Sequence, residues 1–188
     1  MGTLSYTATV SIDGYAADAD GDFQWSAPSG EVFQLHIDRM AAVSTEVLGR
    51  NTYRLMRYWD AEPEDEPWSA AEHEFARRWR ELDLVVASST LDPGDLPAEG
   101  VRLVRDLGLD DLARIVDDAP GEVEIFGPTT ASEAIRAGMV RDFRFFVVPK
   151  IVGGGLRALP GDARLELSLI EHRIFENGTA YLHYVPQR

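Results

Sequence analysis

Three short segments of this chain combine glycines, hydroxyl side chains and one guanidinium, which are groups suited to binding phosphate. They are Gly49-Arg50-Asn51-Thr52, Ser88-Ser89-Thr90 and Gly127-Pro128-Thr129-Thr130. Glycine allows backbone N–H groups to approach an anion closely, and arginine forms charge-assisted hydrogen bonds with phosphate oxygens. Because a dinucleotide carries two or three phosphates, these segments together predict a binding site for such a molecule.

The third segment stands between a predicted strand and a predicted helix. Residues 123–126 are apolar and partly β-branched, as in a strand, and residues 131–137 are rich in helix formers. Thr129 and Thr130 are predicted to cap this helix, and Gly138 to end it. The positive end of the helix dipole would attract an anion, although a βαβ crossover without any ligand explains the same pattern.

Strands and helices alternate along the chain, which predicts where the three segments lie. Strands are predicted at 4–12, 43–48, 82–88, 101–104, 123–126, 143–149, 165–175 and 180–185, and helices at 30–42, 53–59, 70–81, 110–116 and 131–137. This pattern predicts a single α/β domain over residues 1–188, with a mostly parallel central sheet and an antiparallel C-terminal hairpin. Ligands bind beyond the carboxyl ends of the strands in such sheets, and each of the three segments follows a strand.

Local signals predict further details. Ser69 with Glu72 three residues later predicts a capping box. Asn177-Gly178 predicts a hairpin with a type I′ turn. Phe23 and Trp25 stand in a polar loop, where they would either touch a ligand or lie tucked beneath the loop.

Composition excludes several classes of partner and site. The 188 residues are 45% hydrophobic, enough for one full core, and the formal net charge of −14 argues against nucleic acid and anionic membranes as partners. Without cysteine there is no disulfide, thiolate nucleophile or cysteine-ligated zinc, and the four histidines have no metal-ligand spacing. No secretory signal or long apolar run is present, so we expect a cytoplasmic protein.

Four motifs, in this order, resemble the dihydrofolate-reductase-like superfamily. They are SIDGY at 11–15, GRNTY at 49–53, VVASSTL at 85–91, and IFG at 125–127 followed by GMVRD at 138–142. The closest similarity is to the C-terminal reductase domain of bacterial riboflavin-biosynthesis deaminase–reductases, and it extends over nearly the whole chain. The Rossmann G-x-G-x-x-G is absent, as are the H-x-E and P-C-x-x-C motifs of the deaminase half.

The resemblance implies a reductase that binds NADPH on the three segments. The cofactor-binding candidates are Gly49, Arg50, Thr52, Ser88, Ser89, Gly127, Pro128, Thr129 and Thr130. Arg50 and Thr52 would contact a cofactor phosphate and Ser88 the adenosine ribose, while the segment from Gly127 would hold the pyrophosphate. Ser89 stands where such reductases often have arginine, so NADH stays open as an alternative.

The peptide bond between Gly127 and Pro128 is expected to be cis. In the reductases that this chain resembles, the corresponding Gly-Gly bond is cis and turns the backbone beneath the pyrophosphate. A cis bond costs about 0.5–1 kcal/mol before proline, against about 2.5–4 kcal/mol before other residues. The alternative is a trans bond with Pro128 at the first position of a helix.

Two carboxylates are the catalytic candidates. Glu31 follows a Trp-x-x-Pro stretch at 25–28, one place beyond the position at which dihydrofolate reductases carry the carboxylate that binds the pterin. A glutamate in the first turn that stabilises the helix dipole explains Glu31 equally well. Asp13 would lie near the nicotinamide by the same resemblance, or would only turn the chain after the first strand.

We therefore expect an NADPH-dependent reductase, similar to 5-amino-6-(5-phosphoribosylamino)uracil reductase, that acts on a pterin- or aminopyrimidine-like small molecule. Dihydrofolate reduction is the alternative reaction, and a non-catalytic nucleotide-binding or sensing module is the alternative class. A homodimer is expected through the C-terminal strands, because Leu167, Leu169 and Phe175 on a long strand would leave apolar surface to cover.

Overall fold

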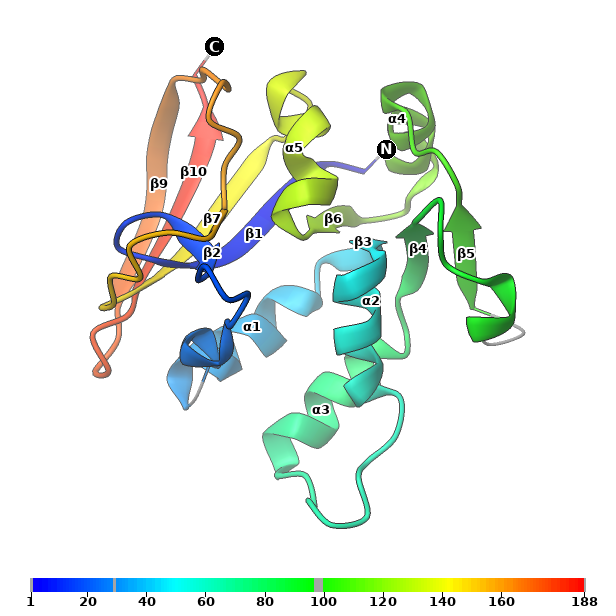
Figure 1. Ribbon diagram of the computed structural model, residues 1–188, viewed down its shortest axis with the longest axis horizontal. Coiled ribbons are helices and arrows are strands. Elements are labelled where there is room, and N and C mark those ends of the chain that lie inside the picture. The colour runs from blue at the N-terminus through cyan, green and yellow to red at the C-terminus, as the bar shows by residue number, and fades with distance from the viewer. Residues whose placement is uncertain (1, 29, 97–99, 188) are drawn as a thin grey trace.

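An eight-stranded sheet runs through the computed structural model, which describes residues 2–28, 30–96 and 100–187 (Figure 1). The strand order is β5-β4-β3-β6-β1-β7-β10-β9, and β10 runs antiparallel to both of its neighbours. The strands are β1 (Leu4–Ser11), β3 (Val43–Gly49), β4 (Asp83–Ala87), β5 (Val101–Val104), β6 (Glu122–Phe126), β7 (Asp142–Val148), β9 (Leu167–Ile174) and β10 (Ala180–Pro186). The predicted α/β class, with a mostly parallel sheet and a C-terminal hairpin, is confirmed.

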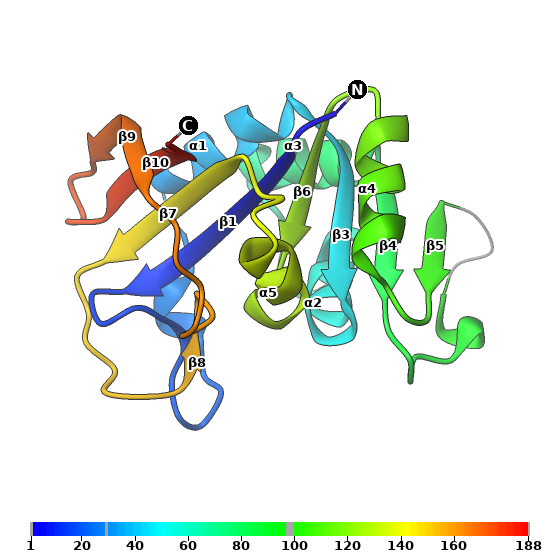
Figure 2. The same cartoon turned by 90° about the horizontal axis from the view of Figure 1, so that it is seen from above.

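Helices cover both faces of the sheet (Figure 2). The α-helices are α1 (Glu31–Met40), α2 (Arg50–Met56), α3 (Ala70–Trp79), α4 (Leu109–Asp118) and α5 (Pro128–Arg136). Helices α1, α2 and α3 pack on one face, and α4 and α5 on the other. Within the described ranges, none of the helices is both long and apolar enough to cross a membrane.

The alternation in β1 explains how the two faces differ. Leu4, Tyr6 and Val10 point toward α4 and α5 and enter the larger core cluster. Ser5 and Thr7 point to the opposite face, yet they are also buried, because α1 covers them. The polar side of this strand therefore faces the protein interior rather than solvent.

Most predicted elements are present, and the capping box of Ser69 and Glu72 at the start of α3 is confirmed. The small antiparallel sheet formed by β2 (Tyr15–Ala17) and β8 (Leu156–Arg157) was not predicted. At Gly155, beside β8, a Cβ atom would lie 2.2 Å from the Ala17 carbonyl oxygen and φ is +125°, so only glycine fits there without strain.

The predicted type I′ turn at Asn177-Gly178 is wrong. The Gly178 N–H donates to the Phe175 carbonyl, so the central residues of the turn are Glu176 and Asn177, and only Gly178 has positive φ. The Asn177 side chain accepts a hydrogen bond from the Thr179 N–H, which stabilises this three-residue loop.

Candidate functional site

The carboxyl ends of β3, β4 and β6 are neighbours in the sheet, and the three segments predicted to bind phosphate follow them. Arg50 donates from Nη1 to Thr90 Oγ1 over 2.6 Å, which joins the segments after β3 and β4. A Cβ atom on Gly49 would lie 2.5 Å from Thr130 Oγ1, so the segments after β3 and β6 are in close contact. The sheet therefore brings the three segments together, as the alternation of elements predicts.

The turn before α5 differs from its prediction. No cis peptide bond is present in the described residues, so the expected cis bond between Gly127 and Pro128 is wrong. Gly127 reverses the chain with φ of +104°, and Pro128 occupies the first helical position, where its fixed φ suits the helix. A Cβ atom on Gly127 would lie 2.9 Å from Thr52 Oγ1, a second close approach between these segments.

The first turn of α5 leaves backbone donors without a side-chain cap. Gly127 is the N-cap residue and has no side chain, so the prediction that Thr129 and Thr130 cap the helix is wrong. Both threonines lie within the first turn of the helix, where their N–H groups have no partner inside the helix. These N–H groups and the helix dipole make the end of α5 suitable for an anion.

Ser88 and Ser89 have structural partners. The Ser88 hydroxyl accepts hydrogen bonds from the N–H groups of Thr90 (3.3 Å) and Leu91 (3.0 Å), which stabilises the turn after β4. Arg105, just after β5, donates to the carbonyl oxygens of Ser89 (3.2 Å) and Leu91 (2.7 Å). Sequence reasoning missed Arg105, because only the pairing of β5 with β4 places it beside this turn.

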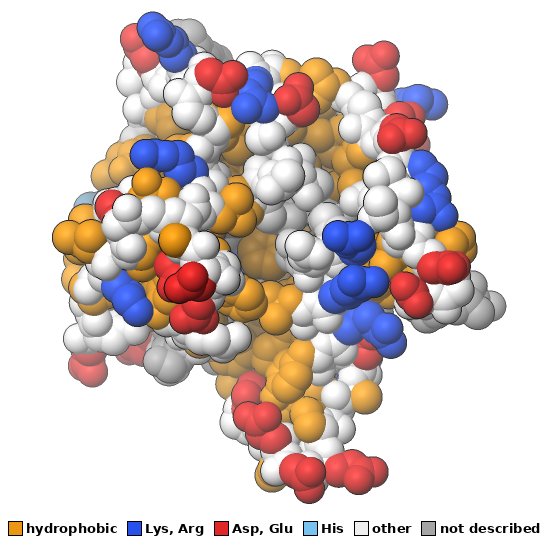
Figure 3. All heavy atoms as spheres, viewed as in Figure 1, with side chains coloured by type: hydrophobic (Ala, Val, Ile, Leu, Met, Phe, Trp, Pro, Cys, Tyr) orange, Lys and Arg blue, Asp and Glu red, His pale blue; other side chains and the backbone are white. Residues whose placement is uncertain are grey.

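Basic side chains gather near this edge of a strongly acidic chain. Arg50, Arg54 and Arg57 follow one another at helical spacing along α2 and the 3₁₀ turn after it (Arg57–Trp59), so they lie on one side. Figure 3 shows Lys and Arg side chains clustered where Figure 1 draws α2. Arg54 lies 3.7 Å from the Asp95 carboxylate and Arg57 lies 3.3 Å from the Asp60 carboxylate, so within the described residues Arg50 is the one of the three without an ion pair and is the best placed to attract a phosphorylated ligand.

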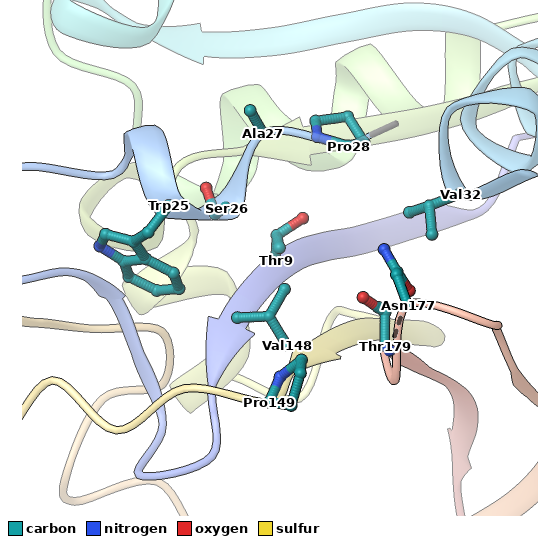
Figure 4. Close-up of a pocket in the computed structure, with 10 residues that line it drawn as sticks. All are labelled: Thr9, Trp25, Ser26, Ala27, Pro28, Val32, Val148, Pro149, Asn177 and Thr179. Carbon is teal, nitrogen blue, oxygen red and sulfur yellow. Dashed lines mark hydrogen bonds between the residues drawn. The ribbon is translucent and has the colours of Figure 1, made fainter. Parts of the chain in front are cut away.

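A pocket of about 190 Å³ lies at the carboxyl ends of β1 and β7 (Figure 4). It is lined by Thr9, Trp25, Ser26, Ala27, Pro28, Val32, Val148, Pro149, Asn177 and Thr179. These residues come from β1, the 3₁₀ turn at Gln24–Ser26 and its C-terminal side, α1, β7 and the β9–β10 turn. None of the lining side chains is charged, and Trp25 offers an aromatic face, so the lining suits a flat, polar ring.

Lys150 supplies a charge at the rim of this pocket. Its Nζ lies 5.6 Å from the centre of the Trp25 ring, within the range of a cation–π interaction. The prediction that an aromatic residue of the 16–26 loop touches a ligand therefore remains open for Trp25. Thr9, Asn177 and Thr179 were not predicted, because they are far apart in the sequence and only the fold brings them together.

The two predicted catalytic carboxylates lie outside the pocket lining. Asp13 accepts hydrogen bonds from the N–H groups of Val152 (3.2 Å) and Gly153 (2.7 Å), tying the turn after β1 to the loop after β7. The Ser11 hydroxyl, followed by these backbone donors, lowers the pKa of Asp13. Glu31 is exposed at the first position of α1 and pairs with Arg173 of β9 over 2.7 Å.

Comparisons with known proteins agree with this architecture. The family model described as the RibD C-terminal domain matches residues 3–116. No curated protein sequence matches the chain. A putative riboflavin biosynthesis protein from Shewanella sp. PV-4 is 21% identical with a TM-score of 0.72, and 99% of each chain is covered.

Two further solved structures share the fold. Dihydrofolate reductase from Enterococcus faecalis, solved with NADP(H), is 16% identical with a TM-score of 0.63, over 99% of this chain and 97% of that one. A deaminase and 5-amino-6-(5-phosphoribosylamino)uracil reductase from Thermotoga maritima is 14% identical with a TM-score of 0.67. The match covers 99% of this chain but 57% of the Thermotoga chain. At these identities the comparisons establish a dihydrofolate-reductase-like fold.

Proposed function

The chain belongs to the RibD C-terminal domain family, and on that premise we propose that it is an NADPH-dependent reductase of the riboflavin-biosynthesis type. The substrate would be an aminopyrimidine- or pterin-like ring. The observation that carries the proposal is the meeting of three phosphate-binding segments at the sheet edge formed by β3, β4 and β6.

The residues at this edge fit a dinucleotide. At positions 49 and 127 any side chain would collide with a threonine hydroxyl of the neighbouring segment. Glycine at both positions therefore lets the segments pack closely together. The uncapped N–H groups in the first turn of α5 would hold the pyrophosphate, and Arg50 would hold a further phosphate. When bound, the nicotinamide would supply the hydride that reduces a C=N or C=O group of the substrate.

The choice between NADPH and NADH depends on cations near the turn after β4. Ser89 lacks the positive charge that related reductases often carry at this place. Arg105 nevertheless extends to the Ser89 carbonyl from the adjacent strand end, and Arg50 binds Thr90 in the same turn. Two guanidiniums beside one turn support binding of a 2′-phosphate, which favours NADPH.

The pocket at β1 and β7 is the proposed substrate site. The Trp25 ring would stack on the substrate ring, and the side chains of Thr9, Asn177 and Thr179 would hydrogen-bond its edge. Glu31 is adjacent in sequence to Val32 of the pocket wall, which keeps it a candidate for binding the substrate. Asp13 would act by holding the loop after β7, through its bonds to Val152 and Gly153.

Two measurements test the proposed function. NADPH is expected to quench tryptophan fluorescence, and its absorbance is expected to fall when the correct acceptor is added. The acceptors would be a phosphoribosylamino-uracil and dihydrofolate, which separates the proposed reaction from the alternative one. Binding of NADPH without oxidation by any acceptor would indicate a nucleotide-sensing module, and no binding would refute the proposed cofactor site.

We also propose a homodimer that uses β9. This strand ends the strand order, and Leu169, Ile170 and Ile174 on it are exposed. Phe175 is buried with Phe146 and Tyr181, so the expectation that it adds apolar surface is wrong. An exposed edge strand with large apolar side chains is a typical surface for pairing with another chain.

Sedimentation equilibrium at micromolar concentration is expected to give twice the 20.9 kDa mass of one chain. Replacing both Leu169 and Ile174 with lysine is expected to shift the protein to monomer, because their partners in β10, Tyr184 and Ala180, place the two side chains on one face of β9. Leu109→Lys, at an exposed apolar position on α4, is the matched control and is expected to leave the dimer intact. A monomeric wild-type protein would refute the dimer.

A further inference from the structure

A row of polar and charged side chains crosses the sheet beneath α1. The strand registers place Glu46 of β3 beside Glu124 of β6, Glu124 beside Ser5 of β1, Thr7 beside Arg144 of β7, and Arg144 beside His183 of β10. Glu46, Glu124 and Arg144 are 5%, 7% and 9% exposed. Charged groups this deeply buried need partners, because burial of an unpaired charge is costly.

Two guanidiniums neutralise part of this row. Arg39 of α1 donates from Nη2 to Glu124 Oε1 (2.6 Å) and to Thr7 Oγ1 (2.7 Å). Arg144 donates to both carboxylate oxygens of Glu122, at 2.6 and 3.0 Å. Each of these arginines therefore has its own carboxylate.

Glu46 has no such partner. Its Oε2 is buried and has no hydrogen-bond partner among the residues that the structure describes. Glu46 and Glu124 are partners on adjacent strands, whose backbones lie about 4.8 Å apart, so their side chains leave the sheet side by side on the same face. Two carboxylates so close together in a medium of low dielectric do not both stay ionised.

The surroundings determine which of the two carries the proton. Burial, and then the negative charge of Glu124, raise the pKa of Glu46 well above its ordinary value. Burial also acts on Glu124, but the positive charge of Arg39 and the Thr7 hydroxyl outweigh it and lower the pKa of that carboxyl. Of the two carboxyls, Glu46 is therefore the one that holds a proton to the higher pH.

Helix α1 connects this carboxyl pair to the pocket. Val32 and Arg39 are seven residues apart and so lie on the same face of the helix. Between them, His36 stacks on Phe146 of β7 with 4.1 Å between ring centres. Phe146 lies beside Thr9 in the sheet, and both Thr9 and Val32 line the pocket.

We propose that Glu46 keeps its proton in the folded protein, so that Glu124 stays the single carboxylate paired with Arg39, and that this ion pair fixes α1 on the sheet and thereby positions Val32 in the pocket wall. Glu46 is thus a positioning residue rather than a catalytic one. The proposal rests on the proposed function only in taking this pocket as the substrate site.

Other titratable groups face the row from each element packed against it. They are His36 of α1, Arg78 of α3, Glu122 of β6, Asp142 of β7, Tyr181 and His183 of β10, and Glu171 of β9. Burial, and then Arg39, lower the pKa of His36 to about 3, so His36 is neutral at physiological pH. Arg78 donates to the Ile37 carbonyl, and His183 lies 2.8 Å from Asp142. All of these groups are present in both the wild type and a Glu46 variant, so the comparison reports the titration of Glu46 together with the carboxyl coupled to it, Glu124.

The proposal fixes the sign of a pH effect. In the unfolded chain Glu46 ionises near its ordinary pKa of about 4.3, whereas in the folded protein it keeps its proton to a higher pH. Between these two pKa values the folded state binds more protons, so the free energy of unfolding falls as the pH rises. A glutamine at this position has the same shape and cannot ionise. In Glu46→Gln the fall in the free energy of unfolding with rising pH would therefore be absent.

Urea unfolding of the wild type and Glu46→Gln from pH 5 to 9 tests this effect. The unfolding equilibrium constant of the wild type, relative to the variant, is expected to rise with pH by up to tenfold per pH unit. Glu66→Gln, in an exposed loop, is the control and should show no such trend. A difference between wild type and Glu46→Gln that is the same at every pH would overturn the proposal.

Hydrogen exchange tests the link to α1. Amides of residues 31–40 are expected to lose protection in the wild type at high pH, after correction for intrinsic rates, but not in Glu46→Gln. Amides of α4, on the opposite face, should behave alike in both proteins. Equal protection of α1 at all pH values would refute the positioning role. Urea unfolding and hydrogen exchange use neither cofactor nor substrate, so their outcome is independent of the reductase assay.

If Glu46→Gln does not fold, carbon-13 NMR of the glutamate carboxyl carbons in the wild type replaces both measurements. One glutamate carboxyl resonance is expected to titrate at a clearly higher pH than the others. A titration in which every glutamate ionises near its ordinary pKa would overturn the proposal.

Discussion

Replacing Arg50 with alanine is expected to weaken NADPH binding by about 1.5–3 kcal/mol, or roughly 10- to 150-fold in Kd. Arg50 is the first residue of α2, it is hydrogen-bonded to Thr90, and it belongs to the cluster of basic side chains on α2. A hydrogen bond from a guanidinium to phosphate is charge-assisted, so its loss costs more than that of a neutral hydrogen bond.

The change in Kd is measured by fluorescence titration with NADPH and with NADH. A smaller loss with NADH would assign Arg50 to the 2′-phosphate, and equal losses would assign it to the pyrophosphate. Arg114→Ala is the matched control, because Arg114 is an exposed arginine on α4. An unchanged Kd in Arg50→Ala would remove Arg50 from the cofactor site.

Replacing Arg144 with methionine is expected to destabilise the protein by about 3–5 kcal/mol. Arg144 and Glu122 are both almost fully buried, and the substitution would leave the Glu122 carboxylate without its bidentate partner. The double variant Arg144→Met with Glu122→Gln is expected to recover most of this loss, because it removes the unpaired charge as well.

Urea unfolding of the two variants measures this difference. Arg114→Met, whose side chain is 73% exposed, is expected to change stability by no more than about 0.5 kcal/mol. A double variant as unstable as the single one would show that Arg144 stabilises the fold through packing rather than through charge neutralisation.

Local patterns predicted the elements that have strong periodicity and clear caps. The alternation of β1 and the capping box of α3 both depend on residues within a few positions of one another, so the sequence contains the whole signal. The strands β2 and β8 are three and two residues long and pair across a long stretch of chain. No local signal indicates so short a pairing, because its stability comes from tertiary contacts.

The part of the candidate site at the carboxyl ends of β3, β4 and β6 was predictable from the sequence, whereas the pocket at β1 and β7 was not. The three segments follow strands, so topology alone places them together. The pocket depends on Thr9, Val32 and Thr179, which an isolated sequence gives no reason to group. The buried carboxylates were not predicted for a similar reason. From the sequence alone Glu124 is expected to face solvent, whereas in the structure Arg39 covers it.

The cis bond before Pro128 was expected from the resemblance alone. The chain makes the turn instead with the positive φ of Gly127, and proline then starts α5. Because the resemblance places the pyrophosphate on a cis turn, the trans bond removes one support for the cofactor site, and the phosphate role of Thr129 and Thr130 rests on their uncapped N–H groups.

The position of β1 determines the order in which the chain is able to fold during synthesis. Among the strands of this sheet β1 is made first, yet its partners are β6 and β7, at residues 122–126 and 142–148. While those residues are still inside the ribosome, Leu4, Tyr6 and Val10 have no sheet to enter and remain accessible to chaperones or to other nascent chains. The strand at the centre of the finished sheet is therefore the first of its strands to emerge and among the last to be protected.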